Sequence, residues 1–229
     1  MLDLKGYGWM LWEGLQVTLL VGVFSLGVAV VLGLLGSWGK LSSSPVARAV
    51  AGTYTTVIRG VPELLLILIV YYGTPTLIQN IAGSLGHDIT LDINPFVAGI
   101  ATIGFIYGAF ATEVFRGAVL AVPKGQLEAA HAYGMNRAQV VRRVLLPQVM
   151  RFALPGLGNL WMVLIKATAL ISVIGLPELV RNAQIAAGST RAPFTFFFTV
   201  ALIFLGITAV SMLVLQRMEK WSNRGIGKA

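Results

Sequence analysis

The sequence predicts an all-α integral membrane protein with five transmembrane helices. Its 229 residues are 56% hydrophobic and only 11% charged, with a mean hydropathy of +0.81, whereas a typical globular chain has about 25% charged residues. Five stretches are long and apolar enough to cross a bilayer, which needs about 20 residues. The chain contains no cysteine, which excludes a disulfide scaffold, a thiolate metal site and an iron–sulfur cluster. We therefore expect a single membrane domain over residues 1–229.

Stretches that lack Asp, Glu, Lys and Arg locate the spans. Residues 152–177 contain only Lys166, and four stretches contain none of these residue types: 14–39, 64–87, 93–112 and 192–216. Ser44-Pro45 and Asn94-Pro95 each place a capping side chain before a proline, which is typical of a helix start. We expect the five spans at about residues 14–38, 45–72, 94–116, 152–176 and 192–216.

The distribution of Lys and Arg predicts the orientation of the chain. Twelve of the 17 basic residues fall in the segments 40–48 and 116–151 or in the C-terminal tail, whereas the opposite side holds three. Basic residues gather on the cytoplasmic side of membrane proteins, so we expect the N-terminus outside and the C-terminus in the cytoplasm. Mixed charges before a long first apolar run predict a retained helix rather than a signal peptide. This topology accounts for the basic composition, and we expect no nucleic-acid partner.

The longest predicted cytoplasmic connection, residues 117–151, has the pattern of two short helices joined by a turn. A stretch of good helix formers ends at Gly134, a typical residue for the end of a helix. Asn136 and Gln139 form the pattern of a capping box at the start of a second helix, which we expect Pro147 to end. This segment should place one short helix on the cytoplasmic side.

The same loop resembles the EAA loop of permease subunits of ABC importers. The pattern of that loop is E-A-A, three residues, G, nine residues, I, any residue, L-P, and only the I position departs, as Val144. The matching residues are Glu128, Ala129, Ala130, Gly134, Leu146 and Pro147. The resemblance implies a type I, MetI-like permease fold whose short helix docks on a separate ATPase subunit. It also implies an interface charge at Glu128, close approach at Ala129 and Ala130, and a turn at Gly134.

Three further segments resemble permeases for polar amino acids. The segment 59–65, R-G-V-P-E-L-L, is similar to their R-G-T-P-L-L. The segment 107–117 is similar to their Y-x-A-x-x-x-E-x-F-R-G, and 164–170 is similar to L-x-K-x-T-S-L, with Ala169 in place of Ser. An acidic residue after R-G-V-P, here Glu63, is most similar to the subunits for histidine, lysine, arginine and ornithine, or for opines. The resemblance therefore implies import of an amino acid, and we expect a basic one.

Polar residues inside the predicted spans are candidates for the substrate path: Arg59, Glu63, Glu113, Lys166 and Thr168. A charged group in the bilayer costs about 2.5–3.5 kcal/mol unless it is paired or hydrated, so a functional role is the default. Glu113 can accept a substrate cation, or it can pair with Arg116 three residues on. Lys166 can bond backbone carbonyls or a carboxylate across the bundle, or it can contact the ligand.

Arg59 and Glu63 stand four residues apart, so on a regular helix they share a face and can pair. Gly60 and Pro62 lie between them, and a broken helix at membrane depth is tolerated only against protein or a watery cavity. We therefore place this segment on the translocation path, with Glu63 selecting positive charge. The alternative is a helix kink near the headgroups.

The sequence contains neither an HExxH motif nor a P-loop of the form G-x-x-x-x-G-K-[ST]. We expect no enzyme activity and no cofactor in this chain, with ATP and Mg bound by a partner. The resemblance implies a second permease subunit, either a paralogue or a copy of this chain, a pair of ATPase subunits and an extracytoplasmic solute-binding protein. It places the chain in the lipid bilayer of a bacterial inner membrane. The alternative is an ion-coupled secondary transporter or channel with an ion site at Glu113; a membrane-embedded enzyme is disfavoured for want of a catalytic pattern.

Overall fold

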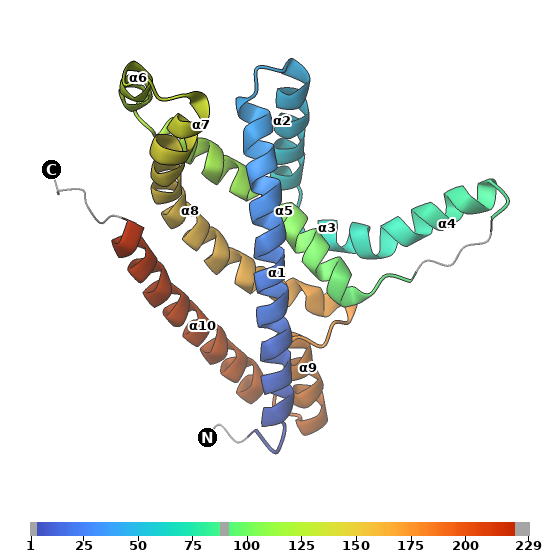
Figure 1. The fold of residues 1–229 in the computed structure, drawn as a ribbon. Coiled ribbons are helices and arrows are strands. Elements are labelled where there is room, and N and C mark those ends of the chain that lie inside the picture. Colours follow the sequence, from blue (N-terminus) through green and yellow to red (C-terminus); the bar gives the residue numbers. More distant parts are fainter. Residues whose placement is uncertain (1–3, 88–91, 223–229) are drawn as a thin grey trace.

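The structure is a computed structural model that describes residues 4–87 and 92–222. Within these ranges every regular element is a helix, and there is no strand (Figure 1). The longer helices are α1 (Gly8–Leu41), α2 (Pro45–Gly60), α5 (Pro95–Leu120), α8 (Leu146–Ala167), α9 (Leu179–Thr190) and α10 (Pro193–Ser222). The shorter elements are α3 (Glu63–Leu68), the π-helical turn η1 (Ile69–Gly73), α4 (Thr74–Ser84), α6 (Lys124–Ala132), α7 (Arg137–Val140), the π-helical turn η2 (Val141–Leu145) and the 3-10 helix η3 (Thr168–Ile174). The predicted all-α fold class is confirmed.

Five helical segments of the described chain are long and apolar enough to cross a membrane, as predicted. They are Gly8–Leu41, Glu63–Ser84, Pro95–Leu120, Arg137–Ile174 and Pro193–Ser222. α1 begins at the end of the molecule that carries α9, and α10 runs from there toward the side that carries α6 (Figure 1). We call these the α9 end and the α6 end.

The centre of the bundle is α5. Within its apolar span 61% of the residues are buried, against 6% in α10 and 6% in the span that contains α4. Small residues bring α1 directly against α5, because a Cβ atom on Gly33 would collide with Ala111 and one on Gly36 with Thr112. Close approach through small residues is a common way to pack helices in membranes. α10 and the α3–α4 segment instead keep their apolar surfaces facing outward.

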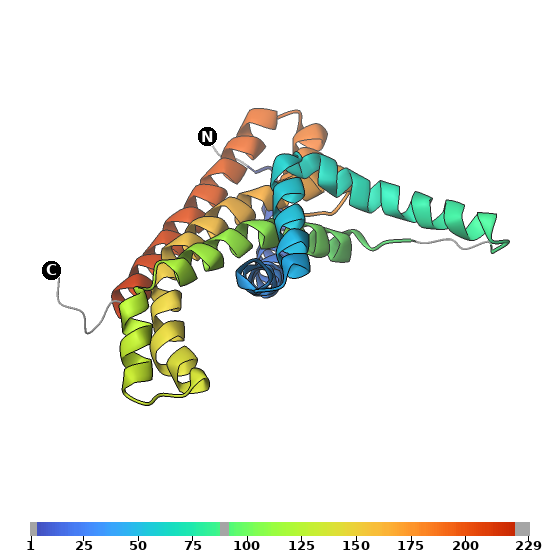
Figure 2. The same ribbon diagram turned by 90° about the horizontal axis from the view of Figure 1, so that it is seen from above.

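The expected second span, residues 45–72, has the wrong bounds, although the interruption expected at Gly60 and Pro62 is confirmed. α2 ends at Gly60, and Val61 is extended, with φ −105° and ψ 137°. Pro62 accounts for this break, since a proline ring disfavours the helical conformation of the residue before it. The segment that can cross the membrane is Glu63–Ser84, which leaves the bundle as an arm in both views (Figures 1 and 2).

The expected stop at Pro147 is also wrong, because the helical segment Arg137–Ile174 continues through it. Pro147 lies in the first turn of α8, and the π-helical turn η2 comes directly before it. A proline ring inside a helix clashes with the carbonyl four residues earlier, and the wider π turn provides room for it. The end of the 117–151 segment and the fourth span are therefore one continuous helical segment.

α9 is a helix that the sequence did not predict. Gly175, with φ +85°, turns the chain after the fourth span, and α9 then packs against α1 and α10 at the α9 end (Figure 1). Leu179, Ala183 and Phe196 are fully buried in the apolar cluster that these helices share. The connection between the fourth and fifth spans is thus a packed element at this end of the bundle.

Candidate functional site

The short helix α6 projects at one end of the molecule (Figure 1). It ends in a left-handed turn at Gly134, with φ +78°. There the amide of Met135 donates to the carbonyl of Ala130 at 3.1 Å. The predicted capping box of the next helix is confirmed, since Asn136 and Gln139 exchange side chain–backbone hydrogen bonds of 2.9 and 3.0 Å. Local hydrogen bonds therefore fix both sides of the turn in this helical hairpin, between α6 and α7, at the end of one helix and the start of the other.

The EAA residues divide between the inside and the outside of this hairpin. Ala130 is buried, whereas Glu128 and Ala129 are exposed on α6. Tyr133, at the tip, is 87% exposed. Leu146 and Pro147 are exposed at the start of α8. α6 thus presents a small, largely uncovered surface beyond the spans, and its ATPase-coupling role stays a prediction.

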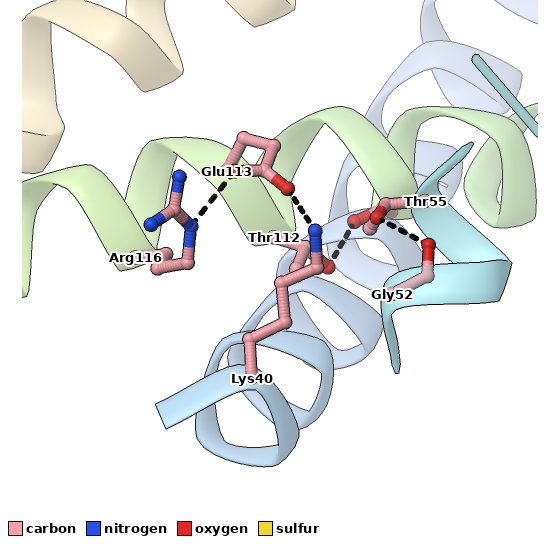
Figure 3. A network of polar contacts seen from close by, with 7 residues as sticks. Lys40, Gly52, Thr55, Thr112, Glu113 and Arg116 are labelled. Atoms are coloured by element: carbon pink, nitrogen blue, oxygen red, sulfur yellow. Dashed lines mark hydrogen bonds and ion pairs between the residues drawn. The ribbon is translucent and has the colours of Figure 1, made fainter. Parts of the chain in front are cut away.

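A first group of charges, the Glu113 cluster, consists of Lys40, Glu113 and Arg116 (Figure 3). Arg116 Nε donates to Glu113 Oε2 at 2.9 Å, and Lys40 Nζ forms an ion pair with Oε1. The carboxylate is half-buried and joins the end of α1 to α5. Both carboxylate oxygens therefore have a cationic partner within the chain. The pair with Arg116 is the one that the three-residue spacing predicted as possible, and Lys40 is a second partner.

The hydroxyl groups near this cluster bond to their own helices. Thr112 donates to the carbonyl of Gly108 at 2.9 Å and Thr55 donates to that of Gly52 at 3.0 Å. The Glu113 cluster consequently owes its cohesion to the two cations. Lys40 was counted only as an orientation signal in the sequence, because a partner 73 positions away leaves no local pattern.

A second group of charges, the Arg59–Glu63 cluster, consists of Arg59 and Glu63 with the rings of Tyr107 and Phe110 on α5. The hydroxyl of Tyr107 donates to Glu63 at 3.1 Å to Oε1 and 3.3 Å to Oε2. The guanidinium of Arg59 lies 5.2 Å from the ring centroid of Phe110. No ion pair joins Arg59 to Glu63, although both lie in the described range 4–87. The expected option of pairing between them is therefore wrong, because the break at Pro62 removes the shared helix face.

This cluster leaves both charges without an ionic partner in the described chain. Tyr107 is 2% exposed, and its ring centroid lies 5.7 Å from that of Phe110, three residues further along α5. The two neighbouring rings form the floor of the cluster. Arg59 is exposed and Glu63 is half-buried above it. A neutral hydroxyl and a ring face stabilise the two charges without neutralising them. Tyr107 and Phe110 lie in the 107–117 segment, but nothing in the sequence pattern predicted that they would belong to the site.

Lys166 and Thr168 are not joined to either cluster by any hydrogen bond or ion pair within the described ranges. Lys166 is exposed in the last turn of α8. Thr168 is fully buried, and its hydroxyl donates to the carbonyl of Ile165 at 2.7 Å. Their place on the substrate path stays a prediction.

Glu178 is a buried acid that the sequence did not single out. It is fully buried before α9, where its carboxylate accepts hydrogen bonds from the amides of Val180 at 2.9 Å and Arg181 at 2.8 Å. Thr18 on α1 donates to the same carboxylate at 3.5 Å. Burial raises the pKa of Glu178 to about 7. An acidic residue directly after Pro177 and before a helix was the available signal, since such residues cap helix starts.

Five helical segments long and apolar enough to cross a membrane, a short exposed helix beyond them and charges at a helix break are typical of the membrane subunit of a transporter. The family model described as "Binding-protein-dependent transport system inner membrane component" matches residues 19–224, and the chain belongs to this family. It is a permease subunit of an ABC importer and a multi-pass protein of the inner membrane.

The similarity to related proteins extends over almost the whole chain. The histidine/lysine/arginine/ornithine transport system permease protein HisQ of Escherichia coli (strain K12) is 45% identical, with 99% of each chain covered. The nopaline transport system permease protein NocQ of Agrobacterium fabrum is 47% identical, with 96% of this chain and 94% of NocQ covered. The similarity to permeases for amino acids is therefore not confined to the EAA loop.

Solved structures share the fold. A chain from the crystal structure of an amino acid ABC transporter with histidines is 32% identical and has a TM-score of 0.82. The match covers 96% of this chain and 97% of that chain. A chain from an inward-facing MetNI methionine ABC transporter has a TM-score of 0.65 at 21% identity, with 93% of this chain and 94% of that chain covered. The predicted type I, MetI-like permease fold is confirmed.

Proposed function

We propose that this chain forms half of the membrane pathway of an ATP-driven importer for basic amino acids, such as arginine, histidine, lysine, ornithine or an opine. The observation that carries the proposal is the Arg59–Glu63 cluster, in which a carboxylate at a helix break forms no ion pair with any described residue of the chain. The relatives HisQ and NocQ support the same substrate class, because their names describe permeases for histidine, lysine, arginine and ornithine and for nopaline. Glu63 would bind the cationic end of the substrate.

The assembled importer would contain this chain, a second permease subunit, two ATPase subunits and an extracytoplasmic solute-binding protein. The ATPase subunits would bind ATP and Mg, since this chain lacks a P-loop. The α6 end would face the cytoplasm, in agreement with the basic residues of the 116–151 segment and the C-terminal tail. The N-terminus and α9 would then face the solute-binding protein.

α6 would transmit movement of the ATPase subunits to the spans. It follows α5, the most buried span, and leads into the continuous helical segment Arg137–Ile174. A push on α6 would therefore move two spans together as rigid elements, which is how domain movements change the side to which a site is open. Glu128 and Ala129 would contact the ATPase, while Ala130 and Gly134 would hold the shape of the hairpin.

The alternative, an ion-coupled transporter with Glu113 as the ion site, fits the geometry less well. Lys40 and Arg116 already occupy both oxygens of Glu113, so an incoming cation would have to displace a cation of the chain. The importer does not need this step, because its energy comes from ATP on the partner. The two mechanisms differ in their requirement for α6.

The test is arginine uptake into proteoliposomes that contain the purified complex, the solute-binding protein and internal ATP. Gly134→Ala forces an L-residue into φ +78°, which costs about 1 kcal/mol and should distort the α6 turn. Gly125→Ala is the matched control, since it lies in the same helix at ordinary φ with open space for the new Cβ. We expect Gly134→Ala to lower ATP-driven uptake severalfold and Gly125→Ala to leave it unchanged. Uptake that needs neither ATP nor an ATPase subunit would overturn the proposal.

A further inference from the structure

The Arg59–Glu63 cluster holds two opposite charges that do not neutralise each other. They are four residues apart in the chain, so even with a fully extended backbone their Cα atoms are within about 14 Å. The long side chains could meet, yet Arg59 lies over Phe110 and Glu63 is held by Tyr107. Unpaired charges inside a membrane protein are costly, so an arrangement that keeps two of them apart calls for a ligand with two opposite charges.

The carboxylate side of this arrangement accepts a cation. Glu63 has only the neutral hydroxyl of Tyr107 as a hydrogen-bond donor among the described residues. Since a carboxylate offers about four lone-pair sites, most of its acceptor capacity is unused. A guanidinium or ammonium group of a ligand can occupy it with charge-assisted hydrogen bonds.

The guanidinium side accepts an anion. Arg59 has no hydrogen bond or ion pair to any residue of the described chain, and its guanidinium carbon lies over the ring of Phe110, 5.2 Å from the centroid. A guanidinium on a ring face keeps its N–H edge free, and that edge matches a carboxylate with two parallel hydrogen bonds. The other arginine of α2, Arg48, is different, because its side chain donates to the carbonyls of Ser42 and Ser43 at 3.0 Å each.

The place of the cluster also suits a transported ligand. It lies at the junction of α2 and α3, about halfway along α1 between the α6 and α9 ends (Figure 1). Transporters commonly bind substrate near the bilayer midplane beside interrupted helices. Tyr107 and Phe110 lie on the most buried span of the bundle, so the floor under a ligand here is fixed.

We propose that Arg59 binds the α-carboxylate of the transported amino acid while Glu63 binds its cationic end, so that the α2–α3 junction recognises a zwitterion that carries an extra positive charge. This inference rests on the proposed function and adds to it a receptor for the carboxylate. It predicts that a cation without a carboxylate is a poor ligand, however well its cationic end fits.

The experiment compares arginine with agmatine, which is arginine without the carboxylate. Equilibrium binding of both is measured on the purified permease–ATPase complex in nanodiscs, without the solute-binding protein, so that only the permease selects. We expect the wild-type complex to bind arginine about tenfold or more tightly than agmatine, since hydrogen bonds to charged groups contribute about 1.5–3 kcal/mol. In Arg59→Gln the affinity for arginine should fall to that for agmatine, and the affinity for agmatine should not change.

Arg48→Gln is the matched control, because it removes an arginine of the same helix that has no contact with the cluster; the preference for arginine should remain. Arg59→Lys keeps the charge but loses the two-pronged geometry, so it should retain part of the preference and serves if Arg59→Gln does not fold. A preference that survives in Arg59→Gln, or an equal loss for both ligands, would overturn the inference. These outcomes leave the importer itself intact, whereas absence of ATP-driven uptake by the wild-type complex would refute the proposed function instead.

Discussion

The two charged clusters of this permease each contain a glutamate and an arginine but hold them in different ways. In the Glu113 cluster one carboxylate has two cations of the chain beside it, Lys40 and Arg116. In the Arg59–Glu63 cluster the carboxylate and the guanidinium each contact an aromatic side chain instead of each other. The first cluster joins α1 to α5, whereas the second lies where the chain is broken between α2 and α3.

The difference separates a structural ion pair from a candidate binding site. A carboxylate whose two oxygens are both engaged by cations gains little from a ligand. A carboxylate with one neutral donor can gain a full charge-assisted interaction. Sequence position alone would favour neither, since all these residues fall in or near predicted spans. The partners in the structure therefore decide which acid is a candidate for selecting substrate.

The largest effect is expected for Glu63→Gln. Loss of the negative charge should weaken arginine binding by about 10- to 100-fold, with a smaller effect on citrulline, the neutral analogue of arginine. The measurement is equilibrium binding of both ligands to the purified complex, followed by uptake of arginine. Equal losses for arginine and citrulline would remove Glu63 as the charge selector, and an unchanged affinity would place it off the substrate path.

A smaller effect, on stability rather than selectivity, is expected for Glu113→Gln. The neutral amide leaves Lys40 and Arg116 facing each other without the carboxylate, and because the cluster is only half-buried the loss should be about 1–2 kcal/mol. Thermal unfolding of the purified complex measures it, with Glu13→Gln, an exposed acid of α1, as the control that should not change. A shift in the arginine-to-citrulline preference would contradict a purely structural Glu113 cluster.

Tyr107→Phe sharpens the comparison within the second cluster. Removal of the hydroxyl that holds Glu63 should weaken arginine binding by about 3- to 10-fold, as for loss of one hydrogen bond, and leave citrulline unchanged. Tyr54→Phe is the control, because the Tyr54 hydroxyl donates to the carbonyl of Phe105 at 2.6 Å and has no hydrogen bond to a residue of the cluster. If arginine and citrulline were weakened alike, Tyr107 would be a packing residue only.

Glu178 is a third kind of acid, buried without any cation, and a pH titration of stability distinguishes it from the other two. Its pKa is about 7 in the folded chain against an ordinary 4.5, so between these values the folded state holds a proton that the unfolded state has released. The contribution of Glu178 to stability should therefore be fully present below pH 4.5 and fall by about 1 kcal/mol between pH 6 and pH 7.

Glu178→Gln keeps an acceptor for the amides of α9 but cannot titrate. Thermal unfolding of wild type and variant over this pH range should show the additional loss in the wild type alone. Parallel curves would mean that the buried carboxylate is charged throughout.

The sequence predicted the features that depend on composition and local pattern. Hydropathy located five spans, and the Asn136–Gln139 spacing predicted a capping box that the structure contains. Other features depend on contacts between distant residues: Lys40 meets Glu113 across 73 positions, and Tyr107 meets Glu63 across 44. No local pattern encodes such pairs.

The wrong predictions have local physical causes. Pro62 was recognised as an interruption, but only the extended Val61 shows that it divides the expected span into two helices. Pro147 was expected to end a helix, yet the π-helical turn before it lets the helix continue. α9 is rich in small and polar residues and lacks the apolar length of a span, so hydropathy did not reveal it.

The most direct test of the contrast between the clusters is an electron cryomicroscopy structure of the assembled importer with arginine bound. We predict that the ligand lies at the α2–α3 junction, with its guanidinium at Glu63 and its carboxylate at Arg59, while Glu113 keeps its bonds to Lys40 and Arg116. Arginine bound at Glu113 with Lys40 displaced would contradict the account and exchange the roles of the two clusters.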